Sequence, residues 1–294
     1  MKTNGHANGK LFEFGPGGSF RGSITEPALP GSQTGVIVFG LGMSEVRIAR
    51  GLARLGLVVM QIRLVENYHD SERRNRFYDD SGIGACRQAI DELASKRGIQ
   101  QVMLMGNCAE ANLCFNTARA DPRVVGLILT NPHFNEVLTA VDAYARKLFR
   151  FAAWRRLLTG KSSLAALRWF VRGRLQGADE RWLAAQSPFT KDIALPLDFD
   201  QKLASLISER GLRAILVFSY TEDGLRYFRK TYGGTLDNLA ASGGLTIEIL
   251  TRDAHVFSRD DEAARQLSEI ICRWGEKALV RQDAPQALAA AQTA

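Results

Sequence analysis

The sequence has no apolar run long enough to cross a membrane. A membrane-spanning helix needs roughly 18 or more consecutive apolar residues, and polar or charged residues interrupt every apolar segment well before that length. The first residues, MKTNGHANGKLFEFGPGG, also lack the apolar stretch of a secretory signal. We therefore expect a cytoplasmic protein.

Cysteine and histidine are both scarce, with four of each among 294 residues. The cysteines form no CxxC pair, and no His stands at zinc-finger spacing from them. We therefore expect neither a disulfide framework nor a metal site, and no cofactor. The cysteines are Cys86, Cys108, Cys114 and Cys272.

The composition is that of an ordinary globular protein, with 46% hydrophobic and 23% charged residues. The net charge is +7 and the isoelectric point is near 9.4. A net positive charge favours binding of an anionic partner but does not identify that partner.

Short apolar runs alternate along the chain with amphipathic stretches of helical period. This alternation predicts βαβ units and a mostly parallel, doubly wound α/β sheet. The expected core covers 10–135 and 211–280, interrupted by a helical insertion at 136–210 and followed by a flexible tail at 281–294. The expected strands are 10–14, 20–27, 34–40, 57–64, 101–107, 124–132, 212–220 and 244–251. The expected helices are 44–56, 81–98, 110–120, 225–233 and 262–279.

Cys108 lies in LMGNCAEAN, between an expected strand and an expected helix. The carboxyl ends of parallel strands are where ligands bind in such sheets. A helix N-terminus and a neighbouring imidazole lower the pKa of a thiol, and the thiolate is the nucleophile. His255, in TRDAHVFS, follows the last expected strand and is the candidate base.

A nucleophile and a base of this kind need a carboxylate to orient the imidazole. Glu222 and Asp223 both follow the strand that ends in LVFSY, so either is a candidate. The backbone N–H groups of Leu41 and Ala109 are the candidate oxyanion hole. Further candidate pocket residues are Gly40, Gly42, Asn107, Glu110 and His133.

The order nucleophile, acid, histidine resembles that of the α/β-hydrolases, from about residue 10 to 280. In this resemblance GNCAEA occupies the nucleophile elbow, normally G-x-S-x-G. Among the branches, the chain is most similar to hydrolases associated with exosortase A systems, which carry a Cys elbow. The segments behind this are LMGNCAEAN, DPRVVGLILTNPHF, FSYTEDGLRYF and DAHVFSRD.

The resemblance implies an α/β-hydrolase fold with a helical lid and a Cys-His-Asp/Glu triad. Other members with a Cys elbow, the dienelactone hydrolases and polyhydroxyalkanoate synthases, imply that the thiol supports both hydrolysis and acyl transfer. We therefore expect a thioesterase-like acyl hydrolase or acyltransferase that acts on a small-molecule thioester or ester.

Two features depart from the family pattern. Glu110 stands where the elbow normally has its second Gly, so it either points into the pocket or bends the elbow. The identity of the triad acid also stays open, because the exosortase-associated pattern selects Glu222 while the spacing in the broader superfamily selects Asp223. The Gly224 that follows resembles the usual Asp turn and favours Asp223.

The expected insertion carries much of the positive charge, interleaved with apolar residues. One reading is a lid whose apolar face covers the active site. The other is a surface that docks an acyl carrier protein, a coenzyme A thioester or an anionic membrane. No nucleic-acid recognition motif accompanies it. The basic residues are Arg146, Lys147, Arg150, Arg155, Arg156, Lys161, Arg168, Arg172, Arg174 and Arg181.

Two other functions are open. A non-catalytic α/β-hydrolase-fold binding or accessory protein is the alternative if Glu110 disables the elbow. A nucleotide-dependent oxidoreductase would use Gly40 and Gly42, but the GxGxxG fingerprint needs a third Gly where Glu45 stands.

Overall fold

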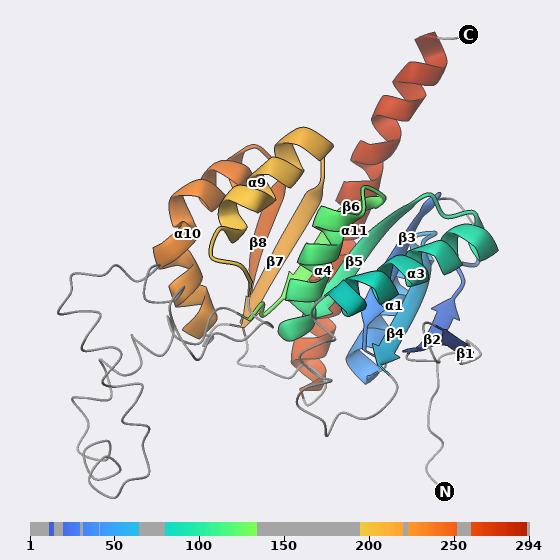
Figure 1. The fold of residues 1–294 in the computed structure, drawn as a ribbon, viewed down its shortest axis with the longest axis horizontal. Coiled ribbons are helices and arrows are strands. Elements are labelled where there is room, and N and C mark those ends of the chain that lie inside the picture. Colours follow the sequence, from blue (N-terminus) through green and yellow to red (C-terminus); the bar gives the residue numbers. More distant parts are fainter. Residues whose placement is uncertain are drawn as a thin grey trace, which may run out of the picture.

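The computed structural model of the chain describes residues 12–14, 20–29, 32–40, 42–64, 80–133, 195–219, 223–251 and 260–292. Figure 1 shows these residues as a central twisted sheet with helices on both faces. All structural statements below refer to these ranges.

The sheet has eight strands in the order β1-β2-β4-β3-β5-β6-β7-β8. β2 runs antiparallel to both of its neighbours, and every other neighbouring pair is parallel. All eight expected strands are confirmed, and so is the doubly wound α/β class. The strands are β1 (Phe12–Phe14), β2 (Phe20–Thr25), β3 (Thr34–Phe39), β4 (Val58–Leu64), β5 (Gln101–Asn107), β6 (Val124–Thr130), β7 (Arg213–Ser219) and β8 (Leu245–Leu250).

The central strands are mostly apolar because helices cover both of their faces. β3, with the sequence TGVIVF, is buried at all six positions, and β7 is buried from Ala214 to Ser219. The parallel ladders bring the strand ends into register, since Asn107 of β5 pairs with Thr130 of β6, and Thr130 pairs with Val217 of β7. The carboxyl ends of the three strands therefore lie next to one another.

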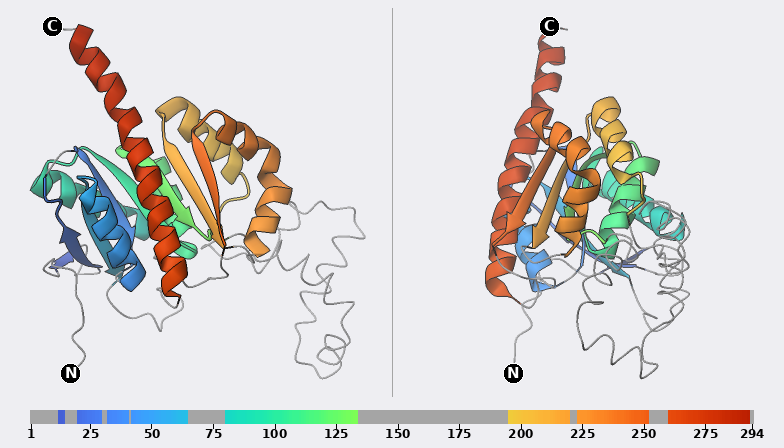
Figure 2. Two further views of the ribbon diagram at one scale, coloured as in Figure 1. Left: turned by 180° about the vertical axis from the view of Figure 1, so that it is seen from behind. Right: turned by 90° about the vertical axis from the view of Figure 1, so that its left-hand side faces the viewer.

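Two helices cover one face of the sheet and four cover the other. Figure 2 shows α1 (Met43–Arg54) and α11 (Asp261–Gln292) side by side on the first face. Their packing is close at Gly51, where a Cβ atom would lie 2.5 Å from Sγ of Cys272. The helices on the second face are α3 (Asp80–Arg97), α4 (Ala109–Ala120), α9 (Phe199–Arg210) and α10 (Asp223–Ala241).

Several helices differ in extent from the sequence-based expectation. α9 falls within the range expected for the insertion, yet its Phe199 and Leu203 are fully buried in the core on the second face. α10 continues to Ala241, and α11 continues to Gln292 through the range expected to be a flexible tail. The basic residues of the expected lid lie outside the described residues. No described helix combines the length and apolarity needed to cross a membrane.

Candidate active site at the β5–α4 turn

Cys108 occupies a strained turn between β5 and α4. β5 ends at Asn107, α4 begins at Ala109, and Cys108 between them has φ 53° and ψ −113°. Residues other than Gly rarely adopt this backbone conformation, and it costs of order 1–3 kcal/mol. A strained strand-to-helix turn that presents one nucleophilic side chain is the geometry of a nucleophile elbow.

Gly106 allows the start of α4 to press against the end of β5. A Cβ atom at this position would lie 2.5 Å from the carbonyl carbon and oxygen of Glu110 and 2.8 Å from the Ala111 nitrogen. No real side chain fits at such distances from the backbone. The first Gly of the motif is therefore required by the packing of the turn.

Gly106→Ala is expected to lower the free energy of unfolding by about 1–3 kcal/mol, the usual range for overpacking. The reason is that the new methyl group meets helix backbone, which cannot rotate away. Urea denaturation of the purified variant measures the change.

Gly84→Ala on α3 is the matched control, because nothing lies within 4 Å of a Cβ atom there. Alanine inside a helix is about 0.5–1 kcal/mol more favourable than glycine, so this variant is expected to be more stable than the parent. An unchanged stability for Gly106→Ala would contradict the close approach.

Backbone hydrogen bonds join Cys108 to the end of β6. Its N–H donates to the Thr130 carbonyl at 2.9 Å, and its carbonyl accepts from the His133 N–H at 3.3 Å. The Thr130 hydroxyl donates to Oδ1 of Asn107 at 3.0 Å. Two candidate pocket residues, Asn107 and His133, thus lie beside Cys108, and the thiol itself is half-buried.

The turn keeps its geometry with Glu110 at the position where the motif normally has Gly. α4 runs without a break from Ala109 to Ala120, and the Glu110 backbone lies against Gly106. Burial raises the pKa of the Glu110 carboxyl to about 7, its own backbone N–H lowers it, and the negative charge of Glu45 raises it further. A carboxyl group with this pKa is substantially protonated at neutral pH.

The turn after β3 lies at the neighbouring strand end, since β3 and β5 are paired in parallel. Gly40 has φ 112°, donates its N–H to the Ile62 carbonyl at 2.8 Å, and accepts at 3.4 Å from Nε2 of the buried Gln61. Gly42 caps α1 with an extended backbone. The first N–H groups of a helix have no intrahelical acceptor, and Ala109, one of the two expected oxyanion donors, is the first residue of α4. Leu41, the other expected donor, lies outside the described residues.

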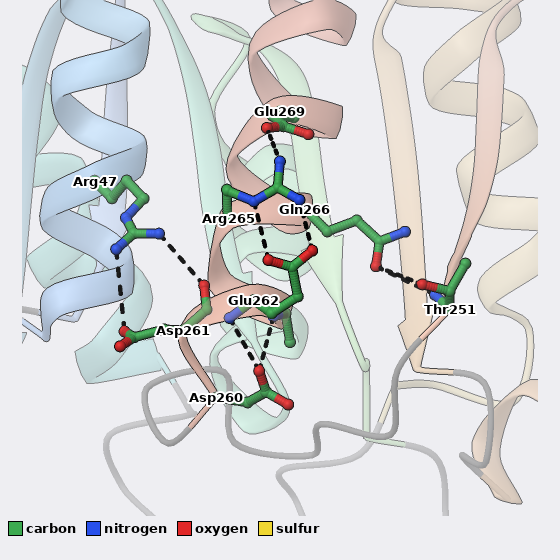
Figure 3. Close-up of polar contacts among 9 residues, drawn as sticks. Arg47, Thr251, Asp260, Asp261, Glu262, Arg265, Gln266 and Glu269 are labelled. Atoms are coloured by element: carbon green, nitrogen blue, oxygen red, sulfur yellow. Dashed lines mark hydrogen bonds and ion pairs between the residues drawn. The ribbon is translucent and has the colours of Figure 1, made fainter.

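The base and the acid are only partly covered by the structure. His255 and Glu222 lie outside the described residues, and Asp223 is described only as the first residue of α10. The structure describes the residues on either side of the His255 segment, Thr251 and Asp260. Thr251 donates through its N–H (3.2 Å) and hydroxyl (3.1 Å) to Gln266, and Oδ1 of Asp260 accepts from the Glu262 N–H at 3.0 Å (Figure 3). Thr251 and Asp260, the described residues on either side of 252–259, thus both bond to α11.

Asn131 stands at the carboxyl end of an expected strand, but its contact with Ser219 beside the elbow was not predicted from the sequence. Asn131 and Ser219 are both buried and hydrogen-bond to each other across the ends of β6 and β7. The visible signal was an Asn directly before Pro132 at a strand end, which is typical of a turn. Within the described ranges, no group of three or more His, Cys, Asp or Glu side chains is arranged to hold a metal ion.

No protein-family model matches the chain, and no curated protein matches its sequence. Solved structures do match. The siderophore hydrolase EstB from Aspergillus fumigatus superposes with a TM-score of 0.57 at 14% identity, covering 94% of this chain and 100% of its own. Carboxyl esterase 2 from Tuber melanosporum gives 0.54 at 16% identity, covering 94% and 89%. An α/β serine hydrolase homologue from Coxiella burnetii gives 0.50 at 12% identity, covering 91% and 97%.

At these identities the matches establish the architecture alone. Together with the strand order and the elbow, they show that the chain has the α/β-hydrolase fold.

Proposed function

We propose that the protein is a cysteine-dependent acyl hydrolase or acyltransferase that acts on a thioester or an ester. The observation that carries the proposal is the strained backbone of Cys108 at the turn from β5 to α4. Strain of this size persists only where the surrounding structure imposes it, and it clusters at active sites. The names of the structural neighbours, a siderophore hydrolase and a carboxyl esterase, support the same class of chemistry.

The mechanism assigns one role to each predicted residue. His255 takes the proton of the Cys108 thiol, and the thiolate attacks the acyl carbonyl to form a carbon–sulfur bond. The N–H groups of Ala109 and Leu41 stabilise the oxyanion. His255 then gives the proton to the departing thiol or alcohol, which leaves a thioester on Cys108.

The second half of the reaction releases the acyl group. Water, or an alcohol or amine acceptor, loses its proton to His255 and attacks the acyl-enzyme carbonyl. The carbon–sulfur bond breaks, the thiolate recovers the proton, and the product is an acid, an ester or an amide. Asp223 or Glu222 stabilises the imidazolium in both halves. The basic residues of the expected lid are proposed to receive an acyl carrier protein or a coenzyme A thioester.

Intact-mass measurement after exposure to a panel of acyl thioesters tests the proposal. We expect one acyl adduct that maps to Cys108, is absent in Cys108→Ala, and is shortened in lifetime when an effective amine acceptor is added. Cys272→Ala is the matched control, because Cys272 is the other half-buried thiol among the described residues and burial raises its pKa.

Other outcomes would count against the proposal. If the panel leaves no adduct on Cys108, or if Cys108→Ala turns over substrate at the parent's rate, the chain is a non-catalytic member of the fold. An adduct that disappears only in Cys272→Ala would indicate simple thiol exchange at the wrong site.

A further inference from the structure

The side chains of Asn131 and Ser219 form a clamp across the carboxyl ends of β6 and β7. Nδ2 of Asn131 donates to the Ser219 hydroxyl at 2.8 Å, and the Ser219 N–H donates to Oδ1 of Asn131, also at 2.8 Å. Asn131 is 2% exposed and Ser219 is 0% exposed. Buried hydrogen bonds of this length between neutral groups are expensive to remove, because each leaves a desolvated partner.

This clamp begins where the backbone ladder stops. The last paired residues of β6 and β7 are Thr130 and Val217, and the Asn131 N–H still reaches the Val217 carbonyl at 2.8 Å. Ser219 lies two residues beyond that pair, where a side-chain amide replaces the missing backbone bonds. Asn131 adopts φ 41°, one of two described non-glycine residues with a positive φ, the other being Cys108.

The same strand end holds the elbow on its other side. Thr130 accepts from the Cys108 N–H, and His133 donates to the Cys108 carbonyl, as described above. Residues 130–133 therefore contact Cys108 through the backbone, while Asn131 holds the end of β7 through its side chain. Glu222 and Asp223 are the third and fourth residues after Ser219, so both candidate acids lie within four residues of the clamped position in the sequence.

We propose that Asn131 is a positioning residue that sets the placement of the triad acid relative to Cys108. It does so by fixing the end of β7 to the same backbone segment that holds the elbow. The inference rests on the proposed function, since it needs a working triad. It assigns to Asn131 no contact with substrate.

A double-mutant cycle on kcat tests this role, with a thioester that acylates Cys108 as substrate. Asn131→Gly removes the amide and tolerates the positive φ. We expect it to lower kcat about 10- to 100-fold and to change KM less than about threefold. In a background where the triad acid is already removed, Asp223→Asn or Glu222→Gln, the same change is expected to lower kcat less than about twofold, because the group it positions is gone.

Ser219→Ala is a second, milder variant for the case that Asn131→Gly does not fold. It deletes only one hydroxyl group, so the fold is expected to remain intact. It breaks the Nδ2 bond and keeps the backbone N–H bond to Oδ1, so a smaller loss of kcat, about three- to tenfold, is expected, again absent in the acid-deleted background. Ser208→Ala on α9, where the hydroxyl is exposed and bonds only to the nearby Ser205 carbonyl, is the matched control and is expected to match the parent.

The outcomes separate this inference from the proposed function. If the parent and Cys108→Ala have equal rates, the proposed function itself fails. If the rate depends on Cys108 but the clamp variants keep the parental kcat, the positioning role is overturned. It is also overturned if the losses simply multiply in the acid-deleted background, or if neither acid substitution lowers kcat.

Discussion

Cys108→Gly is expected to raise the free energy of unfolding of the protein and to lower its kcat/KM at least about a thousandfold. Cys108 holds φ 53° and ψ −113°, a conformation that costs a side-chain-bearing residue of order 1–3 kcal/mol. Glycine adopts this conformation freely. It also makes the unfolded chain more flexible, which lowers the free energy of unfolding by roughly 0.5–1 kcal/mol. The expected net gain is about 1 kcal/mol, measured by urea denaturation at neutral pH.

Under the proposed function Cys108 is the nucleophile, and removing the attacking group of a catalytic triad typically costs many thousandfold in activity. Cys108→Ala is the matched variant. It removes the same sulfur but keeps a Cβ atom in the strained conformation, so it is expected to lose activity equally without the gain in stability. Equal stability of the Gly and Ala variants would mean that the turn is relaxed, and the strain would no longer support a catalytic role.

A trade of stability for function at one residue is what natural active sites commonly show. Here the surroundings that impose the strain can be identified. Gly106 lets α4 approach β5, and Thr130 and His133 hold the two backbone polar groups of Cys108. The elbow is therefore built by its neighbours on β5 and β6, and the second motif glycine, replaced by Glu110, is dispensable for its shape.

The strands could be predicted from the sequence because most are short, largely apolar runs, and β3, TGVIVF, is buried at every position. The position of the strained turn could also be predicted, since a glycine two residues before Cys108 at a strand-to-helix boundary is a local pattern. Helix ends were harder to predict. α10 passes through Gly233 and Gly234, residues that suggest a helix end when tertiary packing is not known.

The clamp between Asn131 and Ser219 could not be predicted, because its two partners are 88 residues apart in the chain. An Asn before a Pro indicates a turn, but nothing local indicates which distant backbone group its amide will meet. The place of α9 in the core was hidden for the same reason. Phe199 and Leu203 are predicted as part of a helical segment. Only the folded chain shows that both are buried in the core and that the Phe199 ring contacts Phe115 of α4 and Tyr232 of α10.

Glu110→Gln is expected to raise the stability of the protein at pH 8 and to leave it nearly unchanged at pH 4. Burial raises the pKa of the Glu110 carboxyl from 4.5 to about 7 in the folded protein, while in the unfolded chain it is expected to stay near 4.5. Between these two values the folded state binds more protons than the unfolded state, so stability falls as the pH rises. Below pH 4.5 Glu110 is protonated in both states, so its ionisation no longer affects the free energy of unfolding. Above pH 7 the full penalty applies, at most about 3 kcal/mol for a shift of this size.

Glutamine copies the shape of the protonated acid and cannot ionise, so the variant escapes the penalty. The measurement is the free energy of unfolding in urea at pH 4, 6 and 8 for parent and variant. Glu209 is an exposed glutamate on α9, and Glu209→Gln controls for the change in net charge.

A second variant, Glu45→Gln, removes the neighbouring negative charge that raises the pKa of Glu110. It is expected to make the pH dependence of stability shallower than in the parent. A difference between Glu110→Gln and parent that is the same at all three pH values would show that the carboxyl is solvated and ionises normally. In that case the raised pKa of the Glu110 carboxyl would have to be abandoned.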